Sequence, residues 1–94
     1  MTMPVGEVRR EIRIRNKHGL HARPAAEFVK TASRFTSDIV VAKEDLEVNG
    51  KSIMGMMMLA AECGSTIVIR ALGADSELAV SELTTLVERG FGEG

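Results

Sequence analysis

A histidine, an arginine and a proline stand close together in residues 19–24, which read GLHARP. A neutral imidazole keeps a lone pair on one ring nitrogen, so the side chain of His21 is able to attack phosphorus. The guanidinium of Arg23 can bind two oxygens of a phosphoryl group at once, and Gly19 lets the backbone turn sharply beside them. These residue types at this spacing indicate a site that accepts a phosphoryl group.

The same residues lie at the start of a predicted helix. Apolar residues recur at intervals of three and four between positions 22 and 32, which is typical of an amphipathic helix. Pro24 belongs in its first turn, where a missing N–H costs nothing. The unpaired N–H groups of that turn and the positive end of the helix dipole attract anions. On spacing alone, a histidine at a helix start can equally be a cap or a surface residue.

Four segments are predicted to be strands. Isoleucines alternate with charged residues over 8–15, as in a half-buried strand. Residues 38–43 are rich in β-branched types, and residues 46–49 form their predicted hairpin partner. A turn at Asn49-Gly50 is the alternative, but the residues after it do not alternate. Residues 66–72 are almost continuously apolar and predict a central strand.

Two more helices complete the chain. Residues 52–59 include four methionines without alternation and predict a short helix. Asp75 or Ser76 can cap a last helix that ends at Arg89-Gly90. Its apolar residues are expected to share the buried face: Leu78, Ala79, Leu83, Leu86 and Val87.

The order of these elements, βαββαβα, predicts one α+β domain over residues 1–94. Its architecture is a two-layer open-faced sandwich, in which three helices cover one face of a four-stranded antiparallel sheet. The tails, residues 1–6 and 91–94, are expected to be loose.

Composition excludes several functions. The formal net charge is −1 and the chain has no Trp or Tyr, which argues against nucleic-acid or anionic-membrane partners. Basic residues between positions 9 and 17 mostly alternate with other types, which favours a solvated strand face over a binding patch. The lone Cys63 cannot form an internal disulfide, and no membrane-spanning segment or secretory signal is present. We therefore expect a cytoplasmic protein without a cofactor.

Two segments, GLHARPAAEFV and KSIMGMMML, closely resemble the HPr family of phosphocarriers of the bacterial phosphotransferase system. The resemblance covers nearly the whole chain and implies the fold predicted above. It implies that enzyme I, charged by phosphoenolpyruvate, phosphorylates Nδ1 of His21, and that the group then passes to a histidine of EIIA proteins. Arg23 is then the anion partner, beside Ala22. The chain is thus expected to be a monomeric substrate of phosphotransferases rather than a free-standing enzyme.

Ser52 stands where the short helix should begin, and capping alone explains a serine there. The resemblance implies a second role. In family members from bacteria with the ATP-dependent HPr kinase/phosphorylase, the matching serine is a regulatory phosphorylation site.

The short helix has more apolar residues than it can bury, so some should form an exposed, adaptable patch. The resemblance implies that this patch contacts both enzyme I and EIIA. Its residues are Ala22, Ala26, Ile53, Met54 and Met57, and Arg23, Lys30, Arg34 and Lys51 are expected to rim it.

Several alternatives stay open. His18 either borders the phosphoryl site or is merely exposed; a metal pair with His21 lacks the third ligand that zinc needs. Residues 87–94 resemble the nitrogen-related branch of the family, NPr, more than the sugar-transport branch. A regulator of the same fold that only binds partners is the alternative function.

Overall fold

The structure is a computed structural model that describes residues 6–93. Its elements follow the predicted order and are β1 (Glu7–Arg13), α1 (Ala22–Ala32), β2 (Asp38–Lys43), β3 (Leu46–Asn49), α2 (Ile53–Met58), β4 (Thr66–Leu72), α3 (Ser76–Glu88) and a 3₁₀ turn (Gly90–Gly92). No helix among residues 6–93 is long and apolar enough to cross a membrane.

The four strands form one sheet in the order β1-β4-β2-β3, and every neighbouring pair is antiparallel. The central strand β4 buries alternate side chains, Ile67, Ile69 and Ala71, as the period of two in a strand requires. Ile12 of β1 lies opposite Ile67, and Ile39 of β2 lies opposite Ala71. The same face of three strands is therefore apolar.

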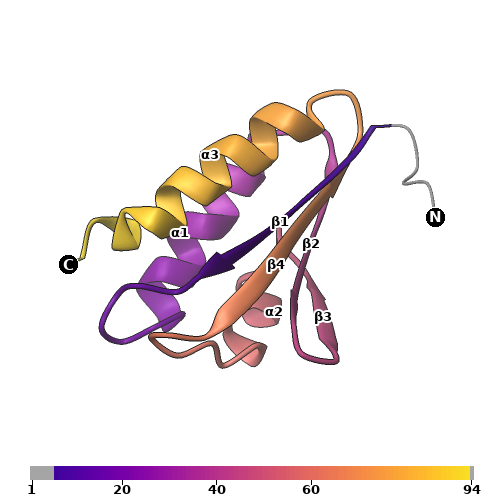
Figure 1. Cartoon of the computed structure of the whole chain (residues 1–94). Helices are drawn as coiled ribbons and strands as arrows, with labels where there is room; N and C mark the ends of the chain where they lie inside the picture. The colour runs from indigo at the N-terminus through magenta and orange to yellow at the C-terminus, as the bar shows by residue number, and fades with distance from the viewer. Residues whose placement is uncertain (1–5, 94) are drawn as a thin grey trace.

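Helices cover that apolar face. Helix α3 packs on β1 and β4 and lies beside α1, whereas α2 contacts α1 and β3 (Figure 1). Phe28 of α1 and Leu83 of α3 are fully buried in the core between helices and sheet. Burial of such a side chain stabilises the fold by about 1.5–3 kcal/mol. The structure confirms the predicted open-faced α+β sandwich.

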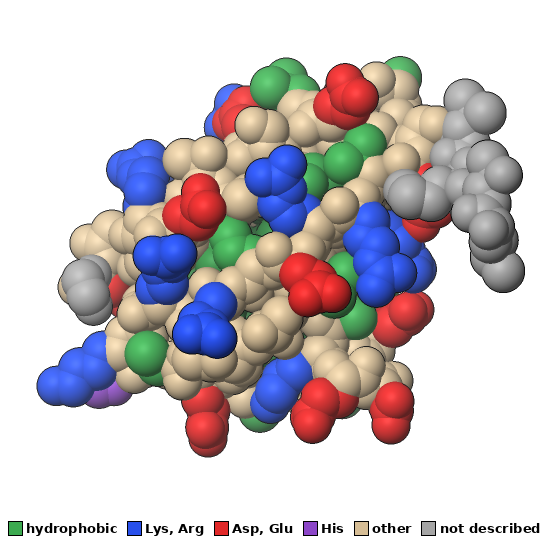
Figure 2. All heavy atoms as spheres, viewed as in Figure 1, with side chains coloured by type: hydrophobic (Ala, Val, Ile, Leu, Met, Phe, Trp, Pro, Cys, Tyr) green, Lys and Arg blue, Asp and Glu red, His purple; other side chains and the backbone are tan. Residues whose placement is uncertain are grey.

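The opposite face of the sheet is charged and mixed. Arg70 of β4 pairs with Glu7 of the neighbouring strand β1 at 3.3 Å and, across β2, with Glu47 of β3 at 3.5 Å. Figure 2 shows Lys and Arg interspersed with Asp and Glu rather than gathered into one basic patch. This agrees with the solvated strand face expected for the basic residues of β1.

The buried face of α3 differs from the prediction. Leu78 is 56% exposed and Leu86 is only half-buried, whereas Ala79, Leu83 and Val87 are buried. These three are spaced by four and define one stripe of the helix. Leu78 directly precedes Ala79 and is rotated about 100° away from that residue, so it faces solvent. The buried stripe is completed by Ser76, Val80 and Thr84.

Asp75 occupies the predicted N-cap position of α3, but its side chain makes no capping bond. Its carboxylate instead accepts hydrogen bonds from the backbone N–H groups of Thr36 and Ser37, at 2.9 Å each, and from both hydroxyls. The Ser37 hydroxyl, followed by the Thr36 N–H, lowers the pKa of Asp75 to about 2. The carboxylate thus joins the start of α3 to the loop before β2.

Residues 91–93, part of the tail that is expected to be loose, contact the rest of the domain. Gly90 is buried, Phe91 packs against the core and Glu93 hydrogen-bonds to residues before α1. Gly6 accepts a hydrogen bond from the N–H of Gly73 at 3.2 Å. The rest of the tail prediction, for residues 1–5 and 94, lies outside the described residues.

Candidate functional site

His21 is the N-cap residue of α1. Its backbone is extended, and its carbonyl oxygen accepts the N–H of Ala25 at 3.0 Å. The side chain makes no capping bond and is 41% exposed, so the imidazole is accessible to a partner. The N–H groups of Ala22 and Arg23 have no carbonyl one turn earlier to bind, as in the first turn of any helix. The imidazole therefore stands beside free donors at the positive end of the helix dipole.

The loop before His21 is held in place by Asn16 and Ala61. The N–H of Gly19 donates to the carbonyl oxygen of Asn16 at 3.1 Å, and Nδ2 of Asn16 donates to the carbonyl oxygen of Gly19 at 2.7 Å. Leu20 donates its N–H to the carbonyl oxygen of Ala61 at 2.9 Å. Gly19 has φ +66°, and a Cβ there would collide with the Ala61 carbonyl. Only glycine fits this position without displacement.

His21 and Arg23, the two predicted site residues, line one shallow pocket of about 380 Å³. Lys17, His18, Gly92 and Glu93 complete its wall. The two cations, Lys17 and Arg23, give the pocket the charge to attract an anion, and a guanidinium can bind two oxygens of a phosphoryl group. The structure thus places the predicted nucleophile, His21, and the predicted anion partner, Arg23, in the wall of one pocket.

His18 both borders the pocket and is exposed, so the two alternatives for this residue are compatible. Its ring meets that of His21 edge-on, with 5.9 Å between centroids and an interplanar angle of 85°. Among residues 6–93, no three His, Cys, Asp or Glu side chains are grouped as metal ligands would be.

Glu93 is a site residue that the sequence analysis missed. Its Oε1 lies 3.1 Å from Nε2 of His21 and accepts a hydrogen bond from Nδ2 of Asn16 at 3.0 Å. Desolvation raises the pKa of this carboxyl, but the hydrogen bonds from His21 and Asn16 and the charges of His21 and Arg23 outweigh it. The pKa of Glu93 therefore lies below its ordinary value. No local pattern signals this contact, because 72 residues separate Glu93 from His21.

Ser52 caps α2 as predicted. Its backbone is extended, and its Oγ accepts the N–H of Gly55 at 3.0 Å. A helix of only six residues gains much of its local order from such a cap.

The methionines of α2 divide between core and surface. Met56 is fully buried, whereas Met54 is 77% exposed and Met57 and Met58 are also exposed. Ile53, Ala22 and Ala26 are exposed too, and α2 contacts α1. We call Ala22, Ala26, Ile53, Met54 and Met57 the docking patch.

The predicted basic rim of the docking patch is only partly formed. Lys30 is exposed, but Arg34 pairs with Glu82 at 3.3 Å. Nζ of Lys51 donates to the carbonyl oxygen of Phe35 at 2.7 Å. Both Glu82 and Phe35 lie outside the docking patch, so these two cations are engaged in contacts away from the patch.

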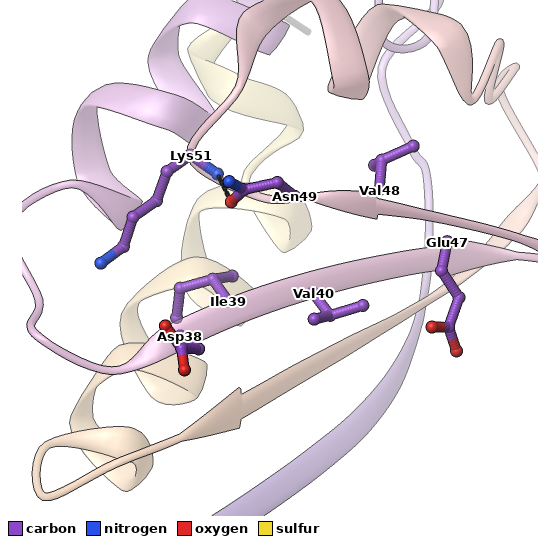
Figure 3. A pocket seen from close by; sticks show the side chains of 7 residues that line it. All are labelled: Asp38, Ile39, Val40, Glu47, Val48, Asn49 and Lys51. Atoms are coloured by element: carbon purple, nitrogen blue, oxygen red, sulfur yellow. Dashed lines mark hydrogen bonds between the residues drawn. The ribbon is translucent and has the colours of Figure 1, made fainter.

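A second pocket, of about 340 Å³, lies at the β2–β3 edge of the sheet, away from His21. Figure 3 shows its two carboxylates, Asp38 and Glu47, at opposite ends. The Oδ1 of Asn49 is engaged in a local hydrogen bond, which it accepts from the N–H of Lys51 at 2.9 Å. No nucleophile and base meet here. Its lining is Asp38, Ile39, Val40, Glu47, Val48, Asn49 and Lys51.

Comparisons with known proteins identify the family to which this chain is similar. A family model described as "PTS HPr component phosphorylation site" matches residues 8–89. The phosphocarrier protein HPr of Neisseria meningitidis is 51% identical over 87 residues, which are 93% of this chain and 98% of the relative. A crystal structure of HPr from Thermoanaerobacter tengcongensis superposes with a TM-score of 0.89 at 49% identity, covering 93% of this chain and 98% of that one. A second structure from that organism, an HPr dimer, has a TM-score of 0.74 and 52% identity, with coverage of 87% and 94%.

Proposed function

This chain belongs to the HPr family and is a phosphocarrier protein of the phosphotransferase system, and we propose that His21 is the residue that carries the phosphoryl group. The observation that supports this most directly is the exposed imidazole of His21 in the same pocket as Arg23, at the start of α1. The donor is phosphorylated enzyme I, charged from phosphoenolpyruvate. The acceptor is a histidine of an EIIA protein.

Transfer needs positioning and charge neutralisation more than covalent chemistry by the protein. The lone pair of Nδ1 forms the new bond to phosphorus while the bond from phosphorus to the donor breaks, and the donor keeps that electron pair. The hydrogen on Nε2 stays in place. Arg23 and the free N–H groups of the first turn stabilise the charge on the phosphoryl oxygens. Donation to EIIA is the same step with the roles of donor and acceptor exchanged.

The docking patch supplies the binding energy for both partners. It adjoins the phosphoryl pocket because α1 carries both Ala22 and the side chain of Arg23, and α2 contacts α1. Exposed methionines adapt to different apolar surfaces, which suits a carrier that meets two partners in turn. One shared surface admits one partner at a time, so we propose a monomer in the cytoplasm as the working form. Light scattering distinguishes it from a dimer like that of the T. tengcongensis protein.

Ser52 is the proposed regulatory site, phosphorylated by an HPr kinase/phosphorylase. Its hydroxyl lies at the N-terminus of α2 and directly precedes Ile53 of the docking patch. A phosphate there adds up to two negative charges beside the apolar surface. It should weaken the binding of a partner whose own surface is acidic.

Labelling tests the assignment of His21. Incubation with enzyme I, phosphoenolpyruvate and magnesium should add one acid-labile, alkali-stable phosphate, and His21→Ala should abolish it. His18→Ala is the matched control, because it removes the neighbouring imidazole and should leave labelling intact. Equal labelling of the His21→Ala protein would refute the assignment, and absence of any labelling in the unchanged protein would favour a regulator that only binds partners.

A further inference from the structure

The C-terminal turn brings a carboxylate to the ring nitrogen of His21 that is not proposed to react. Oε1 of Glu93 lies 3.1 Å from Nε2, and the Glu93 side chain is only 18% exposed. This contact engages Nε2, so Nδ1 is the ring nitrogen that Glu93 leaves free, on a residue that shares its pocket with Lys17 and Arg23.

We propose that Glu93 is a positioning residue for phosphoryl transfer, which holds the His21 imidazole with its hydrogen on Nε2 and thereby presents the lone pair of Nδ1 to phosphorus. This inference rests on the proposed function of His21. A carboxylate orients and stabilises an imidazole in the same manner in hydrolytic triads, where it does not itself become protonated.

The direction of the hydrogen bond follows from the charge of Glu93. Its pKa lies below the ordinary value of a glutamate, so the group is ionised at neutral pH. An ionised carboxylate can only accept, and Nε2 must therefore be the donor. A neutral imidazole has one N–H, so the other nitrogen, Nδ1, has the free lone pair.

The fold fixes Glu93 in position. Phe91 adopts a left-handed backbone with φ +56° and packs against the core, which turns the chain back towards the loop before α1. Asn16 is fully buried, and its Nδ2 donates both to the Gly19 carbonyl and to Glu93. The Oδ1 of Asn16 has no hydrogen-bond partner among residues 6–93, so these two bonds are what its amide contributes to the site.

The carboxylate also acts in the phosphorylated state. When Nδ1 bonds to phosphorus and Nε2 keeps its hydrogen, the ring gains positive charge, which Glu93 stabilises from the opposite side. Lys17 and Arg23 together outweigh the single negative charge of Glu93 in the pocket, so the site still attracts a phosphoryl group.

Three variants test this role. Glu93→Ala removes both the hydrogen bond and the charge, Glu93→Gln keeps an accepting oxygen without the charge, and Glu88→Ala removes an exposed carboxylate from the last turn of α3 as a control. At a pH where the imidazole is neutral, ¹⁵N NMR should show hydrogen on Nε2 of His21 in the unchanged protein, in Glu93→Gln and in Glu88→Ala. In Glu93→Ala, part of the population should carry it on Nδ1.

The rate of phosphorylation by enzyme I should fall about tenfold in Glu93→Ala, less than for a fully buried orienting carboxylate, because water can reach the ring. Glu93→Gln should recover part of this loss, and Glu88→Ala should match the unchanged protein. A Glu93→Ala protein with an unaltered tautomer and an unaltered rate overturns the inference while His21 remains the phosphorylated residue. Labelling that persists in His21→Ala instead overturns the proposed function itself.

Discussion

The N–H of Leu20 donates to the carbonyl oxygen of Ala61 at 2.9 Å, and this bond joins the loop before the phosphoryl site to the segment after α2. The imidazole of His21 and the helix that carries most of the docking patch are thereby held at a fixed distance from each other. A partner that docks on α2, as we propose, meets His21 at a fixed place, which is the positioning that the proposed phosphoryl transfer requires.

Gly19→Ala should break this arrangement. The left-handed backbone at φ +66° costs an alanine about 1 kcal/mol or more, and its Cβ would also collide with the Ala61 carbonyl. Gly64→Ala is the matched control, since it has φ +92° with no atom near the added Cβ. Urea denaturation should show a larger loss of stability for Gly19→Ala than for Gly64→Ala, and its transfer rate should also fall. Equal losses would show that the contact with Ala61 is unimportant.

Arg23→Ala should slow phosphorylation of His21 by about 10–100-fold, because one donor to the phosphoryl oxygens is lost. The side chain is exposed, so the free energy of unfolding should change little. Arg23→Lys should restore part of the rate, because the lysine ammonium keeps the positive charge but cannot bind two phosphoryl oxygens in the planar geometry of a guanidinium. Arg10→Ala, which removes an exposed cation on β1 outside the pocket and the docking patch, is the control in rapid-quench measurements. If both alanine variants slow the reaction equally, Arg23 contributes only general charge.

Met54→Glu should weaken binding to enzyme I and to EIIA by about tenfold or more, since it places a charge within the proposed apolar docking patch. The fold should be unaffected because Met54 is 77% exposed. Leu78→Glu offers a matched control, as Leu78 is an exposed leucine of α3 outside the docking patch. Titration calorimetry with each partner measures the difference. Unaltered affinity of Met54→Glu would exclude this residue from the interface.

Ser52→Ala should lower the free energy of unfolding by about 1 kcal/mol, because the N–H of Gly55 loses its acceptor. Ser52→Thr keeps the hydroxyl and should retain most of that stability. With ATP and HPr kinase/phosphorylase, the unchanged protein should gain an acid-stable phosphate that Ser52→Ala lacks. A phosphate that persists on Ser52→Ala would place the modification on another hydroxyl.

Asp75 should make stability depend on acid pH. Its pKa is lowered from 3.8 to about 2 in the folded chain, so the unfolded state binds the proton more tightly. The stabilisation is present in full above about pH 4 and is lost as the pH falls towards 2. Asp75→Asn should lower the denaturation midpoint at neutral pH. It should also flatten the acid limb, which is the part of the curve of stability against pH that falls between about pH 4 and 2. Asp45→Asn, at an exposed turn, should retain it; an equally steep limb in Asp75→Asn would contradict the assignment.

The sequence by itself determined the helices and strands and the proximity of His21 and Arg23. Alternation around Ile12, the proline in the first turn of α1 and the serine before α2 are local signals, and each corresponds to an element in the structure. His21 and Arg23 could be paired in advance because two residues at a helix start necessarily lie near each other. The family resemblance rested on those same local motifs.

Only the tertiary structure decided which residues from distant parts of the sequence contact these elements and the residues of the site. Glu93 reaches His21 across 72 residues, and Arg34 and Lys51 are drawn to Glu82 and Phe35. Met56 and Met54 are the same residue type two positions apart, yet one is buried and the other exposed, because packing against α1 and β3 sets the rotation of α2. Hydrophobic periodicity and secondary-structure propensity reflect residues that are close in the sequence. The contacts named here depend instead on how the helices pack on the sheet and on one another.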